Sequence, residues 1–97
     1  MPRPQILNEQ EINKKLKDIP LWDIKDGMLV REIPNQNFID AVGKLNAIAI
    51  IAEKLNHHPD LLIYGWNKLR ISTKTHDVGG ITELDFQLAK NIDKLNY

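Results

Sequence analysis

Residues 38–59 read FIDAVGKLNAIAIIAEKLNHHP, and this stretch decides how the rest of the chain is arranged. Apolar residues recur in it at intervals of three and four, the spacing of one face of an α-helix. They are Phe38, Ala41, Val42, Leu45, Ile48, Ala49, Ala52 and Leu55. Pro59 disfavours helical geometry in the residue before it, so the helix is predicted to end near His57. This is the longest predicted helix and it has the widest apolar stripe.

A pair of short strands is predicted on each side of this helix. Before it, an alternating run leads to Asp26-Gly27, which suits the positive φ angles of a tight hairpin turn. After it, Leu69, Ile71 and Thr73 alternate with polar residues, which indicates a strand with one face against a core. The four predicted strands are residues 21–25, 28–33, 61–64 and 68–75.

Two further helices are predicted at the ends of the chain. Asn8 and Glu11 have the spacing of a capping box at the start of a helix over residues 9–17. Thr82 is predicted to cap a helix after the Gly79-Gly80 turn, with Ile81 packing onto Phe86 and with Glu83 and Asp85 at its positive end. The order αββαββα predicts one α+β domain over residues 1–97, a four-stranded antiparallel sheet with three helices packed on one face.

Composition narrows the function classes. Thirteen basic and thirteen acidic residues cancel, so nothing in the charge indicates a nucleic-acid or anionic-membrane partner. The chain has no cysteine and no apolar run long enough to span a membrane, which favours a soluble cytoplasmic protein. A core of this size gains from association, and the open edges of a sheet favour pairing with a second subunit.

The candidate chemistry lies in three histidines close in sequence. Glu53 and His57 are four residues apart, so the helix is expected to place them on one face, where they can form a hydrogen bond. His58 follows directly, and His76 ends the fourth predicted strand. Asp85 begins the last helix near the same sheet edge, so a cleft there could hold all five residues. Histidine exchanges protons near neutral pH, which predicts general acid/base chemistry.

Plainer alternatives exist for each of these residues. A histidine at the end of a helix can simply interact with the helix dipole, and His-Pro can simply end the helix. Glu53, His57 and His76 could bind zinc with one open position, although their spacing matches no zinc motif. Trp66 could stack on a flat heterocycle, but a large aromatic in a small domain is more often part of the core or of an interface. The core is favoured for Trp66 and more strongly for Trp22.

The spacing of these residues resembles the signature of the pterin-4a-carbinolamine dehydratase family. The resemblance starts with Glu53-x-x-x-His57-His58-Pro59 and continues, after six residues, with Trp66. Nine residues then lead to His76 and eight more to Asp85. The αββαββα order extends the likeness to nearly the whole chain, and no signature position departs from the pattern.

The resemblance implies a reaction, the loss of water from a 4a-hydroxytetrahydropterin to give the quinonoid dihydropterin, with no metal or other cofactor. It implies that His57 and His76 form the acid/base pair, that His58 binds the pterin, and that Glu53 and Asp85 orient imidazoles. By the same resemblance, residues next to the histidines are expected to contact the pterin. These are Asn56, Thr75 and Asp77, and Trp66 completes the expected binding set.

The resemblance also implies partners. Family members assemble as homodimers or homotetramers, and an aromatic amino acid hydroxylase would supply the pterin for cofactor recycling. Some members act instead as dimerisation cofactors of a homeodomain transcription factor. A non-catalytic interaction module is therefore the alternative function.

Overall fold

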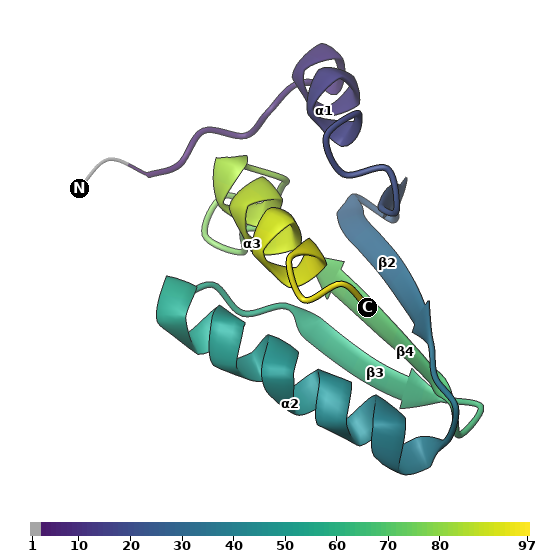
Figure 1. Cartoon of the computed structure of the whole chain (residues 1–97). Helices are drawn as coiled ribbons and strands as arrows, with labels where there is room; N and C mark the ends of the chain where they lie inside the picture. The colour runs from purple at the N-terminus through teal and green to yellow at the C-terminus, as the bar shows by residue number, and fades with distance from the viewer. Residues whose placement is uncertain (1–2) are drawn as a thin grey trace.

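The computed structural model describes residues 3–97 and contains three helices and four strands within that range. Their order confirms the predicted αββαββα arrangement (Figure 1). The elements are α1 (Glu9–Leu16), β1 (Asp23–Lys25), β2 (Met28–Pro34), α2 (Phe38–Leu55), β3 (Asp60–Tyr64), β4 (Lys68–Thr73) and α3 (Glu83–Asp93).

The four strands form one antiparallel sheet in the order β1-β2-β4-β3. Strands β1 and β2 form one hairpin, and β3 and β4 form the other. The two hairpins are joined by the pairing of β2 with β4, in which Arg31 lies opposite Ile71. Asp26 and Gly27 turn the first hairpin with φ angles of 53° and 75°, as their sequence predicts. The short β1 and the longer β3 are the edge strands. The central strands β2 and β4 alternate in burial, as expected of a sheet covered on one face.

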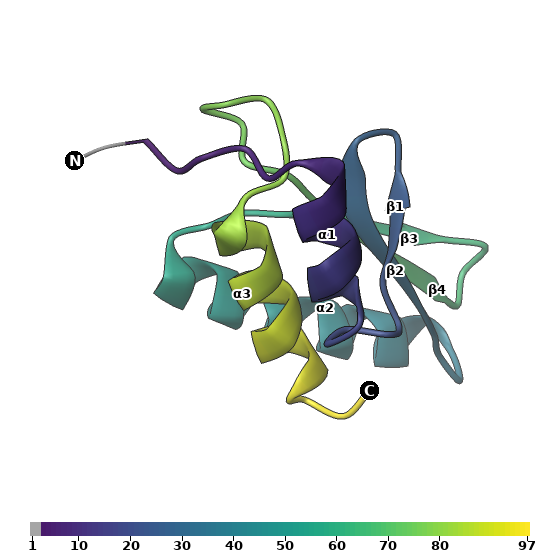
Figure 2. The same cartoon turned by 90° about the horizontal axis from the view of Figure 1, so that it is seen from above.

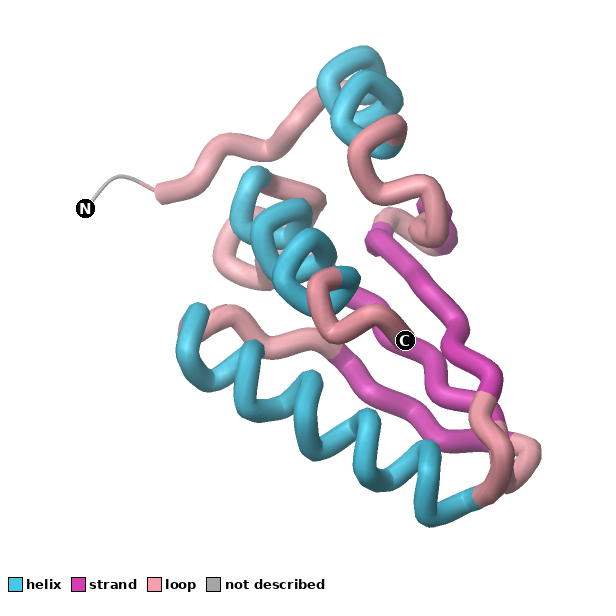
Figure 3. The backbone as a smooth tube through the Cα atoms, in the orientation of Figure 1, coloured by secondary structure: helices cyan, strands magenta, loops and turns pink. Residues whose placement is uncertain are grey.

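The three helices cover the same face of this sheet (Figures 1 and 2). Between the helices and the sheet lies a continuous apolar core. It is built from Ile19, Trp22, Leu29, Ile33, Ile48, Ala52, Leu69, Ile71, Ile81, Phe86, Leu88, Ala89 and Ile92. The tube drawing shows that α2 and α3 lie side by side on the sheet, while α1 stands beyond the far side of α3 (Figure 3).

The capping box predicted at Asn8 and Glu11 is present, and Thr82 caps α3 as predicted. The Asn8 side chain accepts a hydrogen bond from the Glu11 backbone N–H at 2.8 Å, and the Glu11 carboxylate accepts one from the Asn8 N–H at 3.0 Å. Thr82 and Asp85 form the equivalent pair at the start of α3. These reciprocal bonds satisfy N–H groups that the first helical turn leaves free, which is why each helix begins where its sequence predicts.

Two strand boundaries differ from the prediction by two residues, and one residue of the predicted apolar stripe is exposed. The first strand begins at Asp23 because Trp22 is held in a turn by its backbone bond to Ile19 O, and its indole is buried. The fourth strand ends at Thr73, beyond which Thr75 makes an isolated bridge to Gly80. Phe38 was expected in the apolar stripe of α2, but it is 56% exposed, because it occupies the first turn beyond the edge of the core.

Over residues 3–97, none of the helices has the length and apolar character that crossing a bilayer requires.

Candidate functional site

The end of helix α2 directs His57 toward the protein interior. The helix stops at Leu55, and Asn56 adopts the left-handed conformation with φ 50° and ψ 42°. The His57 N–H then donates to the carbonyl of Ala52 at 3.1 Å, the long closing bond of a Schellman motif. Asparagine tolerates this conformation better than most residues with a Cβ atom. The turn therefore takes His57 off the helical path and leaves its side chain only 11% exposed.

This turn corrects the expected pairing of Glu53 with His57. The four-residue spacing would place them on one helical face, but His57 is no longer on the helix. Glu53 instead lies 2.5 Å from Nε2 of His58, and both of these side chains are largely exposed. Nε2 of His57 lies 2.6 Å from Oδ1 of Asp85, a residue 28 positions further along the chain.

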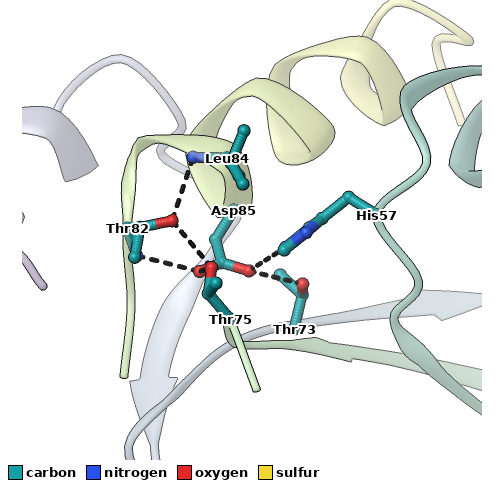
Figure 4. Close-up of polar contacts among 6 residues, drawn as sticks. All are labelled: His57, Thr73, Thr75, Thr82, Leu84 and Asp85. Carbon is teal, nitrogen blue, oxygen red and sulfur yellow. Dashed lines mark hydrogen bonds and ion pairs between the residues drawn. The ribbon is translucent and has the colours of Figure 1, made fainter. Parts of the chain in front are cut away.

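Asp85 is fully buried and is the centre of a polar network (Figure 4). As the third residue of α3, it accepts a hydrogen bond from the Thr82 backbone N–H at 2.9 Å. The hydroxyls of Thr73 and Thr75 donate to it at 2.7 and 2.9 Å. A buried carboxylate is stable when such donors replace its water, so the network fixes the carboxylate against which His57 rests.

His57 forms part of the wall of a cleft of about 310 Å³ at the same end of the sheet. This volume is at the lower end of the range for small-molecule sites. Six residues predicted for the site line it, namely Asn56, His57, His58, Thr75, His76 and Asp77. The other lining residues are Pro4, Lys74 and Leu84.

His76 reaches the cleft from a short loop after β4. The bridge between Thr75 and Gly80 closes the loop, and the Gly79 N–H donates to the Thr75 carbonyl at 2.9 Å. Gly79 has φ 71°, a conformation that glycine adopts without strain. His76 itself is exposed, in contrast to the buried setting of His57. Two imidazoles from different elements therefore line one cleft in different environments.

Three predicted residues do not line the cleft. Asp85 lies behind His57, and Glu53 contacts His58 from the exposed surface of α2. Trp66 is 62% exposed in the turn between β3 and β4, so it is not part of the core, the placement that its residue type favours. The reason lies in β3, which starts beside the histidines and carries the chain to the opposite end of the sheet (Figure 1). Within this chain Trp66 cannot stack on a ligand in the cleft.

The sequence analysis missed the buried donors around Asp85 and the cationic side chain of the cleft. Thr73 offered a signal, since it continues the inward-facing series Leu69 and Ile71 with a hydroxyl, and a buried hydroxyl needs a partner. Lys74 follows it on the outward-facing series and lines the cleft. For Pro4 the sequence contains no such signal. Its position depends on how residues 3–7 run along the loop before α3, where the Leu7 N–H donates to Ile81 O at 2.9 Å.

The described residues contain no group of three or more histidine, aspartate or glutamate side chains placed to hold a metal ion. Of the set considered for zinc, Glu53 pairs with His58 and His57 pairs with Asp85. The polar contacts of the site are those of imidazoles with carboxylates.

Comparisons with known proteins agree on one family. The family described as "Pterin 4 alpha carbinolamine dehydratase" matches residues 5–95. A Prochlorococcus marinus protein named "Putative pterin-4-alpha-carbinolamine dehydratase" is 46% identical over 94 residues, covering 96% of each chain. A protein of the same name from Sulfurisphaera tokodaii is 43% identical over 89 residues, covering 92% of this chain and 95% of its own.

Two solved structures share the fold. A structure described as a transcriptional coactivator/pterin dehydratase from Brucella melitensis has a TM-score of 0.85 and 30% identity, covering 93% of this chain and 97% of its own. A pterin dehydratase-like protein, described as a RuBisCO assembly factor in the alpha-carboxysome, has a TM-score of 0.59 and 20% identity. That match covers 76% of this chain and 84% of the other.

Proposed function

Because the chain belongs to the pterin 4 alpha carbinolamine dehydratase family, we propose that it removes water from a 4a-hydroxytetrahydropterin by acid/base catalysis with His57 and His76. The observation that carries this proposal is the placement of these two imidazoles on one cleft, from the end of α2 and from the loop after β4. The cleft has the size of a small-molecule site.

The reaction needs one acid and one base. The acid protonates the hydroxyl on carbon 4a so that it leaves as water. The base removes the proton from the adjacent ring nitrogen, whose electron pair forms the new carbon–nitrogen double bond. One proton is given and one is taken, and the product is the quinonoid dihydropterin plus water. A positioned histidine typically contributes about a hundredfold to ten-thousandfold to such a transfer.

The remaining residues of the cleft have supporting roles in this proposal. His58 faces the pterin and is oriented by Glu53 at 2.5 Å. Asn56, Thr75 and Asp77 line the cleft beside the two catalytic imidazoles and offer polar groups to the edge of a pterin. The reaction transfers protons without oxidation or reduction, so it needs no redox cofactor. In a cell, an aromatic amino acid hydroxylase would supply the substrate and the product would return to the tetrahydropterin.

An interaction module remains the second candidate, and one surface favours it. Ile39 and Ile50 on α2 are 71% and 60% exposed, so this helix presents apolar side chains to a partner. Of the two similar structures, one is described as a transcriptional coactivator/pterin dehydratase and the other as a RuBisCO assembly factor. Binding to a transcription factor would not require the two imidazoles, whereas dehydration would.

The test is the rate of dehydration of a 4a-hydroxytetrahydropterin generated in the cuvette by a hydroxylase, compared with its spontaneous rate. We expect His57→Ala and His76→Ala each to lower kcat by about a hundredfold. The double variant should lose less than the product of the single effects, because residues acting as a unit are not additive. A folded wild type that gives no acceleration, or a double variant with full activity, would reject the assignment.

A further inference from the structure

The two oxygens of Asp85 are saturated by donors. Oδ1 lies 2.7 Å from the Thr73 hydroxyl and 2.6 Å from His57 Nε2. Oδ2 lies 2.9 Å from the Thr75 hydroxyl and 2.9 Å from the Thr82 backbone nitrogen. Three of these four partners, the two hydroxyls and the backbone N–H, donate hydrogen bonds to the carboxylate (Figure 4).

The hydroxyl chain behind Asp85 has a single consistent direction. A threonine hydroxyl has one proton, and that of Thr75 is donated to Asp85. In the 2.7 Å contact between Thr75 and Thr82, the Thr82 hydroxyl must therefore be the donor. Thr82 in turn accepts from the Leu84 N–H at 3.2 Å. Every proton in the chain points toward Asp85, which leaves its carboxylate as an acceptor alone.

An acceptor-only carboxylate decides which nitrogen of His57 holds the proton. Nε2 lies against Asp85 and must donate, so in the neutral ring Nδ1 carries the lone pair. Among residues 3–97, no side chain or backbone group forms a hydrogen bond with Nδ1. His57 also lines the cleft, and Nδ1 is the ring nitrogen that has no partner among these residues.

We propose that His57 is the base of the reaction through Nδ1, and that Thr73 is a positioning residue that sets its strength by sharing Oδ1 of Asp85. The role as base rests on the proposed dehydratase function, whereas the proton position does not. Thr73 is fully buried and touches Asp85 rather than the cleft. Its hydroxyl takes up part of the negative charge on the same oxygen that faces His57. The Thr73 hydroxyl and the imidazole therefore compete for one oxygen, and loss of the hydroxyl would leave Oδ1 of Asp85 to His57 alone.

Other charged groups around His57 act in the same cleft. His58 follows it in the chain, and Lys74, His76 and Asp77 line the cleft from the end of β4 and the loop after it. From α3 the facing charge is that of Asp85. Replacing Thr73 alters none of these charges, so a change in pH dependence in that variant reports on the contact between Thr73 and Asp85.

The first test is the proton position in the wild-type protein, measured by long-range 15N–1H correlation spectra of the histidine rings above the pH at which they are neutral. We expect His57 with protonated Nε2 and bare Nδ1. Protonated Nδ1 would overturn the proposal. This measurement needs neither substrate nor activity, so it can hold even if the protein fails to dehydrate the pterin, and the two failures are distinguishable.

The second test compares the pH profile of kcat/KM in Thr73→Val, Thr73→Ser and the wild type. Valine has the shape of threonine without the hydroxyl, and serine keeps the hydroxyl. We expect the acid limb to move up by about half a pH unit or more in Thr73→Val, since one bond to a charged group is worth about one pH unit. Serine should restore the wild-type limb.

Ser72→Ala is the matched control, because Ser72 is the neighbouring residue of β4 and points to the other face of the sheet. It should leave the profile unchanged. A uniform loss of rate in Thr73→Val without a shift would show a purely structural role and overturn the proposal for Thr73. A shift of the alkaline limb instead would make His57 the acid and overturn its role as base. Thr73→Ser keeps the test decisive if the valine variant unfolds.

Discussion

The chemistry of the site depends on one buried carboxylate. Asp85 has two roles. Its side chain accepts a hydrogen bond from the Thr82 N–H at the start of α3, and it is also the hydrogen-bond partner of His57. It has no exposed surface, so donors from the protein replace all the water that an exposed aspartate would have. Removing its charge should therefore affect both the stability of the fold and the orientation of the imidazole.

Asp85→Asn tests this double role. An amide cannot accept at both ends, so two of the four donors would face an NH2 group. We expect a loss of about 2 kcal/mol in the free energy of unfolding and a loss of about tenfold or more in kcat. Urea denaturation and the dehydration assay measure the two effects.

Asp60→Asn is the control, because Asp60 is exposed on β3 and forms no hydrogen bond with another described side chain. It should change the free energy of unfolding by less than about 0.5 kcal/mol. Equal behaviour of the two variants would show that the network around Asp85 contributes little.

At the scale of elements, the end of α2 sets the position of the imidazole. A helix that continued through residue 56 would keep His57 on the exposed side beside Glu53. The left-handed turn at Asn56 instead lets His58 take that place and moves His57 inward. The loop after β4, closed by the bridge between Thr75 and Gly80, positions His76 in the same way.

Substitutions at Asn56 should separate backbone geometry from side-chain size. Asn56→Gly should leave the free energy of unfolding within about 0.5 kcal/mol of the wild type, because glycine adopts φ 50° freely. Asn56→Val should lower it by about 1–2 kcal/mol, because a β-branched residue clashes in this conformation. Urea denaturation of both variants checks the difference. Equal stability of the two would mean that the turn does not require a permissive residue.

On the open face of the sheet, a polar cluster joins three strands. The Tyr64 hydroxyl donates to Glu32 at 2.6 Å, and Arg70 donates to the same carboxylate at 2.9 Å. These bonds, with that from Tyr64 the stronger, hold the pKa of Glu32 below its usual value of 4.5. A lowered pKa in the folded state means that the contribution to stability is present above the unfolded value and is lost as pH falls through the folded value.

Glu32→Gln should therefore make the free energy of unfolding depend less on pH in the acidic range. The wild type should lose more of its free energy of unfolding than the variant between about pH 6 and pH 3, with the difference arising below about pH 4.5. Urea midpoints at the two pH values measure it. The effect is small because the cluster is exposed to solvent. If the urea midpoints of the wild type and the variant fall by the same amount between the two pH values, Glu32 does not contribute to the acid sensitivity of the fold.

At the scale of the whole molecule, most of the fold could be predicted from the sequence because its signals are local. The alternation in β4, the turn at Asp26-Gly27 and the caps at Asn8 and Thr82 each depend on a few neighbouring residues. The sequence predicted two hairpins in one antiparallel sheet, but not that β2 and β4 are the strands that join them.

The polar contacts of the site were less predictable because they join distant segments. The spacing of Glu53 and His57 predicted a bond between them, but a single left-handed residue redirected the chain. The contact of His57 with Asp85 spans 28 positions, and that of Thr73 with Asp85 depends on how α3 sits over β4. The residue type of Trp66 favoured the core, whereas its place in a hairpin turn leaves it exposed.

The apolar surface of α2 is a property of the whole molecule, since a chain of this size gains from covering it. We expect the wild type to associate through this surface and Ile50→Glu to shift the molar mass toward the 11.2 kDa of one chain. Light scattering after size exclusion measures this, with Gln10→Glu on α1 as the control. A wild type that is already monomeric would contradict the prediction.

The left-handed residue at the end of α2 also has a consequence for how related sequences vary. A member of the family can keep the imidazole at position 57 against its carboxylate only if the preceding residue accepts φ 50°. We therefore expect related sequences to have Asn, Asp or Gly at the position equivalent to 56, and to lack Val, Ile and Thr there. A homologue with a β-branched residue there, even with all three histidines intact, would be one in which selection for the histidine–carboxylate pair has been relaxed.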